Sequence, residues 1–179
     1  MKDRIEKYKS ELNNVTEKIK NDLNKYFKGF DYNSNHRDIE IISIKSEKDI
    51  NQIYASPGFY IILTDNEFND NECSFKFKNQ TAIYRGHSYS TRKRISSHLA
   101  NDTYKQNKKL GEPNYTVCLK IEEGINGINI NNLPYRNWNW TVIVHKMRNS
   151  NELIREQAEL AFDATFGKPC KSRESKNKN

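Results

Sequence analysis

The segment 84–98 concentrates side chains that suit phosphate chemistry. It holds three Arg, one Lys, two His and two Tyr. Arg94 and His98 are four residues apart, so on a helix they share one face, and we expect that face to lie opposite the apolar Ile95 and Leu99. A guanidinium offers planar, permanently charged donors to a phosphate, which a lysine does less well. The same composition is also typical of a solvated basic helix face.

The carboxylates of the segment 151–166 are a second group that suits chemistry. Glu152, Glu156 and Glu159 fall on one stripe of a predicted helix. Their hard oxygen atoms favour Mg²⁺ or Mn²⁺ as a divalent ion. The three Cys, at 73, 118 and 170, are far apart and form no CxxC pair, so a structural zinc site is not expected.

Composition limits the class of protein. The chain has 179 residues, with 30 Lys and Arg against 23 Asp and Glu, which gives a formal charge of +7. This length suits one domain, and the positive charge favours a polyanionic partner. No apolar run approaches the ~20 residues needed to span a bilayer, and the first residues show no secretory signal. Because the Cys are scattered and odd in number, we expect reduced thiols and a cytoplasmic protein.

Strand and helix patterns predict how the chemical groups are positioned. β-Prone residues follow the turn at 56–58 and run to Thr64, and a second such run covers 81–86, so we expect the two to pair as a hairpin. Ser90 is a candidate N-cap for the helix that carries Arg94. The other predicted elements are a helix over 3–28, a strand over 39–44, a short helix around 50–53, a loop over 100–113, strands over 114–122 and 138–147, and a last helix from Asn149 or Ser150 to Phe166.

These elements predict an α+β fold. We expect a small mixed or antiparallel β-sheet flanked by helices, preceded by an amphipathic helix whose apolar positions recur every three or four residues. The expected organisation is a helical arm over 1–30, one domain over 31–170, and a charged, flexible tail over 171–179.

Five features of the chain, taken in order, form a recognisable pattern. They are Gly58-Phe-Tyr60, Tyr84-Arg-Gly86, Arg94 ten residues after Tyr84, His98 one helical turn later, and a glutamate in the last helix. Over roughly 57–169 this pattern resembles the GIY-YIG nuclease family. The long insertion between the triplets and the extra N-terminal helix are similar to its restriction-endonuclease branch.

Two departures from the family pattern accompany the resemblance. Phe59 and Arg85 replace the middle Ile of the two triplets. Many members also place an Asn shortly after the proline that corresponds to Pro169, and this chain has none there. Either Ser172 or Lys171 substitutes for it, or this branch dispenses with the contact.

The resemblance implies a GIY-YIG-like nuclease domain over 31–170 that hydrolyses DNA with the help of a metal ion. By analogy, Tyr60 abstracts a proton from the attacking water and Tyr84 hydrogen-bonds the water or the phosphate. Arg94 binds the phosphate, and His98 positions it or relays a proton. A phenol has a pKa of about 10, so we expect the cations of 85–98 to lower the pKa of Tyr60.

The resemblance also implies a metal-binding glutamate in the last helix, holding Mg²⁺ or Mn²⁺. In the family this residue precedes an apolar pair and, about nine or ten residues later, a proline. Glu159, ten residues before Pro169, fits best, and Glu156 is the alternative.

Double-stranded DNA is the expected partner, bound through its phosphates. On a strand Arg85 faces away from Tyr84, so its guanidinium needs solvent, a carboxylate or DNA. The residues expected to contact DNA are Arg85, His87, Arg92, Lys93, Lys105, Lys108 and Lys109. A restriction enzyme that cuts both strands at one place needs two active sites, so a homodimer is expected in that case.

Two other functions fit parts of the sequence. The altered triplets and the missing Asn favour a catalytically degenerate GIY-YIG-fold module that binds nucleic acid without cutting it. A basic protein-interaction module, such as an inhibitor of a nuclease, fits the composition but leaves the ordered Tyr-Tyr-Arg-His-Glu set unexplained. Metal-dependent cleavage separates the nuclease from the first alternative, and DNA binding separates it from the second.

Overall fold

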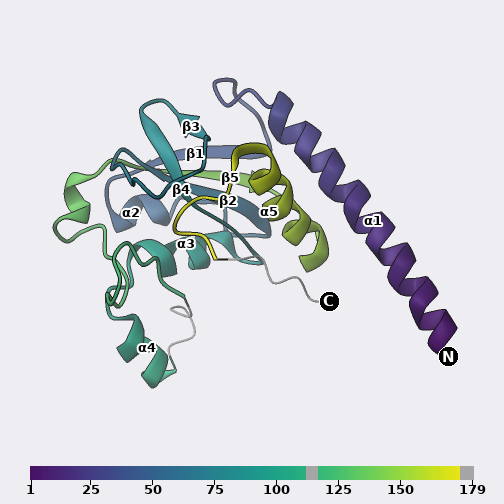
Figure 1. Cartoon of the computed structure of the whole chain (residues 1–179). Coiled ribbons are helices and arrows are strands. Elements are labelled where there is room, and N and C mark those ends of the chain that lie inside the picture. Colours follow the sequence, from purple (N-terminus) through teal and green to yellow (C-terminus); the bar gives the residue numbers. More distant parts are fainter. Residues whose placement is uncertain (112–116, 174–179) are drawn as a thin grey trace.

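A five-stranded antiparallel sheet forms the centre of the fold (Figure 1). The computed structural model describes residues 1–111 and 117–173, without the side chain of Lys108. The strands are β1 (Ile39–Ile44), β2 (Gly58–Thr64), β3 (Lys76–Phe77), β4 (Gln80–Ser88) and β5 (Trp140–Lys146). Their order across the sheet is β1-β5-β2-β4-β3, and each neighbouring pair is antiparallel. The predicted α+β class and the pairing of 58–64 with 81–86 are therefore confirmed.

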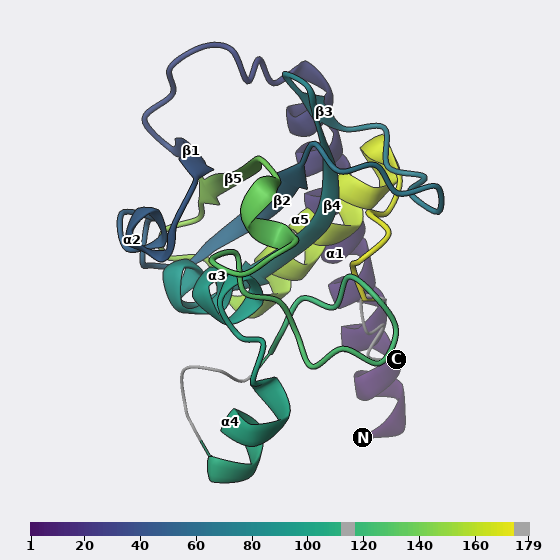
Figure 2. The ribbon, with the colours of Figure 1, turned by 90° about the vertical axis from the view of Figure 1, so that its left-hand side faces the viewer.

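Helices cover both faces of this sheet (Figure 2). The helices are α1 (Lys2–Gly29), α2 (Glu47–Ile50), α3 (Thr91–Leu99), α4 (Tyr104–Leu110) and α5 (Glu152–Phe166), with a 3-10 turn η1 (Tyr135–Asn137). α2 and α3 contribute to the apolar core on one face, and α1 and α5 contribute to the core on the other. α4 lies away from the sheet (Figure 2). Among the described residues, no helix combines the length and the apolar character that a membrane span needs.

The central strand β2 separates two apolar cores, because its successive side chains point to opposite faces. All seven of its residues are buried. Tyr60 and Ile62 pack in the core that includes Ile95 and Leu99 of α3. Phe59, Ile61 and Leu63 pack in the other core, against Ala158, Ala161 and Phe162 of α5. The sheet therefore holds α3 and α5 on opposite sides of β2 and β4.

Two predicted segments between α3 and β5 need correction. The predicted loop 100–113 contains the helix α4, which projects from the body in Figure 1. Residues 117–122 of the predicted strand 114–122 form no strand, and 114–116 lie outside the described residues. Leu119 and Ile121 are buried in the core beside α3, while Ser97 and Asn101 donate hydrogen bonds to the carbonyl of Val117, both at 2.6 Å. Side chains of α3 and its C-terminal flank thus take the place of a neighbouring strand.

Both ends of the last helix are fixed by capping. The helix starts later than predicted, since Asn151 is its N-cap and accepts a hydrogen bond from the backbone of Ile154 at 3.0 Å. It ends at Phe166, as predicted, with Gly167 at a φ of 81°, a value that favours glycine.

The helix predicted over 3–28 is present as α1, and only its C-terminal half lies against the body. Phe27 is buried against Phe59 and Phe162. Ile5, Leu12 and Val15, in the first half, are exposed at 46%, 51% and 52%. Figure 1 shows this half extending away from the sheet.

His145 of β5 ties the end of α1 to the sheet. The Tyr26 hydroxyl lies 3.1 Å from Nδ1 of His145, and the Tyr32 hydroxyl lies 3.1 Å from Nε2. Burial lowers the pKa of this imidazole to about 3. The folded protein therefore keeps His145 neutral at any pH near physiological.

We predict that this neutral histidine makes stability fall in mild acid. Below pH 6.5 the imidazole of His145 is protonated in the unfolded chain and stays neutral in the folded one. The free energy of unfolding therefore decreases as pH falls from 6.5 toward about 3. His145→Gln should reduce the slope of unfolding free energy against pH in this window by up to ~1.4 kcal/mol per pH unit. Urea titrations at several pH values measure the slope. An identical slope in parent and variant would contradict the prediction.

Candidate functional site

The side chains predicted to be catalytic line one pocket of about 330 Å³. They come from four elements: Tyr60 from β2, Tyr84 from β4, Arg94 and His98 from α3, and Glu159 from α5. β3 pairs with β4 only at Gln80 and Thr81, so the later part of β4 lies at the edge of the sheet. This edge position lets a pocket receive side chains from both faces.

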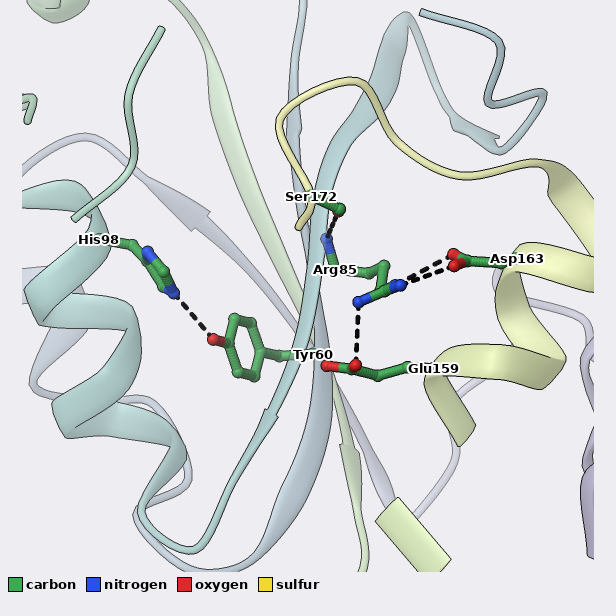
Figure 3. Close-up of polar contacts among 6 residues, drawn as sticks. All are labelled: Tyr60, Arg85, His98, Glu159, Asp163 and Ser172. Atoms are coloured by element: carbon green, nitrogen blue, oxygen red, sulfur yellow. Dashed lines mark hydrogen bonds and ion pairs between the residues drawn. The ribbon is translucent and has the colours of Figure 1, made fainter. Parts of the chain in front are cut away.

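Tyr60 and His98 form a buried pair within the pocket (Figure 3). The phenol oxygen lies 3.0 Å from Nε2 of His98, and each residue is 1% exposed. The alternative interpretation of a solvated basic helix face therefore does not hold for His98. Residues 117–119 close that side of α3, where the backbone of Leu119 donates to the carbonyl of His98.

Burial determines the protonation of this pair. It raises the pKa of Tyr60 well above its usual range, and Tyr84 adds to the rise while the charge of Arg94 opposes it. It also lowers the pKa of His98 to about 3, and here the charge of Arg94 acts in the same direction. The expectation that nearby cations lower the pKa of Tyr60 is corrected, because desolvation outweighs them. At neutral pH both groups are uncharged.

Gly86 provides the space for the Tyr60 ring. The two residues are directly opposite in the β2–β4 register. A Cβ on Gly86 would lie 2.6 Å from the Tyr60 hydroxyl and 3.0 Å from the Tyr84 ring. The glycine of the second triplet is therefore required by contact with the buried phenol.

Arg85 lies on the opposite side of β4, where it binds two carboxylates of α5 (Figure 3). Its Nε and Nη2 donate to the two oxygens of Asp163 at 3.0 and 2.6 Å, and its Nη1 donates to Glu159 at 2.9 Å. Its side chain is 3% exposed. The sequence left solvent, a carboxylate or DNA as partners of the Arg85 guanidinium, and in the structure it binds carboxylates. Asp163 was missed, although its spacing of four from Glu159 marks a shared helix face.

Among the described residues that line the pocket, Glu159 is the acidic one. Glu156, the alternative ligand, is not among the lining residues. The described residues contain no cluster of three or more His, Cys, Asp or Glu suited to a metal. Mg²⁺ usually keeps several waters and binds one or two carboxylates together with substrate phosphates. Glu159 therefore fits a site completed by substrate and water, and it does so while sharing Arg85 with Asp163.

The residues expected to contact DNA are distributed over several surroundings. His87 lines the pocket, and burial together with the charge of Arg155 lowers its pKa to about 4. Arg92 donates to the carbonyl of Ile53 at 2.7 Å. Lys93 on α3 and Lys105 and Lys109 on α4 are exposed, and the side chain of Lys108 lies outside the description.

Residues after the last helix complete the pocket. Lys171 donates from its backbone to the carbonyl of Ile83 at 2.9 Å, and the hydroxyl of Ser172 accepts from the backbone of Arg85 at 2.9 Å. The first residues of the predicted flexible tail thus bond to β4. Arg173 and Cys118 also line the pocket. Neither was expected, since neither belongs to a motif.

Comparisons of the chain with models of protein families, with curated proteins and with solved structures find no match.

We predict that Arg85 contributes strongly to stability because it neutralises two carboxylates out of water. Arg85→Met should lower the free energy of unfolding by about 3–5 kcal/mol, the usual cost of breaking a buried ion pair. Lys20→Met breaks a pair with Glu17 on the surface of α1 and should cost less than about 1 kcal/mol. Urea denaturation of both variants measures the difference. Equal effects of the two substitutions would show that the buried pair has no special role.

Proposed function

We propose that the protein is a metal-dependent DNA endonuclease of the GIY-YIG type. One observation carries the proposal: two tyrosines, an arginine, a histidine and a glutamate from four separate elements line a single pocket. A solvated basic helix face would not need Tyr60 and His98 to meet in the interior. The similarity to the restriction-endonuclease branch remains part of the proposal.

Arg94 is proposed to bind the scissile phosphate. It lines the pocket and is the cation whose charge acts on both Tyr60 and His98. A guanidinium can stabilise the negative charge that grows on the phosphoryl oxygens as water attacks. A bound phosphate would in turn offset the charge of Arg94, which is one of the two main causes of the low pKa of His98. Substrate binding would therefore make His98 a better proton acceptor.

Tyr60 is proposed to pass a proton from the attacking water to His98. As the phenol oxygen accepts a proton from the water, its own proton moves to Nε2 across the 3.0 Å contact. The phenol remains neutral before and after the step, and the imidazole gains the positive charge. This relay avoids a phenolate in a buried site, where its charge would be costly.

Glu159 is proposed to hold Mg²⁺ or Mn²⁺ together with substrate phosphate and water. When bound, such an ion stabilises the charge on the phosphoryl oxygens as a Lewis acid. The Arg85 contact fixes the carboxylate of Glu159 at the border of the pocket. Asp163, which takes two hydrogen bonds from the same guanidinium, leaves the three-residue group with a net negative charge that favours a cation.

A second candidate is a module with this fold that binds DNA without cutting it. The observation that favours it is the ion pair between Glu159 and Arg85, since a neutralised carboxylate attracts a metal ion less strongly. Arg85 stands where the family pattern has an apolar residue in the second triplet. A chain with that apolar residue could not form the ion pair with Glu159.

We predict that purified protein cuts supercoiled plasmid with Mg²⁺ or Mn²⁺ and not with EDTA. Arg94→Ala should reduce the rate by about 10²–10³-fold, as expected for loss of one positioned donor to a developing charge, and Glu159→Gln should abolish cleavage. Both variants should still bind DNA. Arg4→Ala, on the exposed first half of α1, is the matched control and should cut at the parental rate.

The products separate the two candidate functions. Discrete bands indicate sequence-specific cleavage, and a direct step to linear plasmid indicates the cooperation of two active sites, as in a homodimer. Binding without any cleavage would move the assignment to the non-cutting module. Cleavage by Arg94→Ala at the parental rate would remove Arg94 from the mechanism.

A further inference from the structure

A second pocket, of about 540 Å³, lies where β2 begins and where β4 and β5 end. It is lined by Tyr54, Ser56 and Pro57 before β2, by Tyr89 after β4, and by Arg148 and Ser150 after β5. Its volume falls in the range of about 300–1,000 Å³ typical of small-ligand sites. The catalytic scheme uses none of these residues. Among the described residues that line it, none is acidic.

Aromatic rings and guanidinium groups are combined at this pocket. Tyr89 is 74% exposed, and its ring lies 5.2 Å from the guanidinium carbon of Arg155. The centre of the Tyr54 ring lies 5.9 Å from the guanidinium carbon of Arg148. Tyrosine rings and guanidinium planes are the surfaces on which unstacked nucleic-acid bases stack. The Tyr54 hydroxyl is buried without a hydrogen-bond partner among the described residues.

The two pockets are adjacent along two elements. Tyr89 follows Gly86 by three residues, which is roughly 10 Å along an extended chain. Arg155, which supports the Tyr89 ring, precedes Glu159 by one turn of α5 and acts electrostatically on His87 of the first pocket. Gly86 lines the first pocket and Tyr89 lines the second, so the two pockets are three residues apart along this segment.

The helix that carries Arg94 also fixes one wall of the second pocket. Thr91 donates from its hydroxyl to the carbonyls of Tyr54 and Ser56, the latter at 3.2 Å. Arg92 donates to the carbonyl of Ile53. The wall over 53–57 and the phosphate-binding residues of α3 are therefore held in one arrangement, which suits a single strand that contacts both.

We propose that the second pocket binds one unstacked nucleotide of the DNA strand that is held in the catalytic pocket. The base stacks on Tyr89, and Arg148 contacts a neighbouring phosphate. This inference rests on the proposed function for the identity of the strand. It adds a requirement that the fold of a nuclease does not by itself impose, namely that a base leaves the duplex stack beside the cut.

The test compares binding of two labelled oligomers by fluorescence anisotropy in EDTA, where no cleavage occurs. One is an oligothymidylate, and the other is an abasic deoxyribose-phosphate chain of the same length. Tyr89→Ala should weaken oligothymidylate binding by about 5- to 150-fold, the equivalent of ~1–3 kcal/mol for one stacked base at 1.36 kcal/mol per tenfold. It should leave abasic binding unchanged, and Tyr89→Phe should retain base-dependent binding.

Two further variants define the comparison. Tyr8→Ala removes another exposed tyrosine, on the first half of α1, and should alter neither affinity. Arg148→Ala should weaken both oligomers, because it removes a phosphate contact. Equal losses of both oligomers in Tyr89→Ala would overturn the stacking assignment.

The outcome is independent of the cleavage assay. Parental protein that cuts plasmid while Tyr89→Ala binds oligothymidylate normally would refute the nucleotide pocket and leave the nuclease intact. Base-dependent binding through Tyr89 in a protein that never cuts would support the pocket and refute the nuclease.

Discussion

A guanidinium held out of water between two carboxylates joins the sheet to α5. Arg85 cannot lose its proton, and a charge in the interior is tolerated only when opposite charges and hydrogen bonds surround it. Glu159 and Asp163 provide both, so the position of α5 relative to β4 is set by charge as well as by the apolar contacts of Phe162. The same interaction places Glu159 at the pocket border. The requirement of one buried cation therefore determines where the acidic group of the site lies.

On the opposite side of β4, burial keeps the titratable side chains uncharged. Tyr60 and His98 are neutral, buried and hydrogen-bonded to each other. Arg94 lines the same pocket, and its charge acts on both members of the pair. The candidate site thus consists of a neutral, desolvated pair between a positive group from α3 and a net negative group from α5. An anionic substrate and a cationic metal ion would each find a complementary side, which is why the arrangement suits phosphate chemistry.

Parts of the fold were predictable because local pattern and tertiary contact agree. The strands over 58–64 and 81–86 are apolar, β-prone runs bounded by turn residues, and they pair as expected. The alternation in 114–122 failed as evidence for a strand, because Leu119 and Ile121 bury themselves against α3 and not within the sheet. The helix α4 was not predicted, because its lysine-rich sequence has too few apolar residues to show a helical repeat.

The site was partly predictable for a different reason. Order and spacing identified the residues that line the pocket, yet they carried no information on burial. The neutral state of the Tyr60–His98 pair depends on how completely the core and residues 117–119 cover it. The two carboxylates on Arg85 likewise follow from the register of α5 against β4. Neither distance can be derived from separation along the chain, because both contacts join residues more than thirty positions apart.

The contact between Gly86 and the Tyr60 ring has an evolutionary consequence. A methyl group at position 86 and a phenol at position 60 would compete for the same volume, so the two positions cannot drift independently. A descendant that replaces Tyr60 by a smaller residue could accept a side chain at position 86. A descendant that keeps Tyr60 would still need glycine there. In a set of diverged sequences, the pair should behave as a single inherited unit, and a side chain at position 86 should mark lineages in which position 60 has taken a smaller residue.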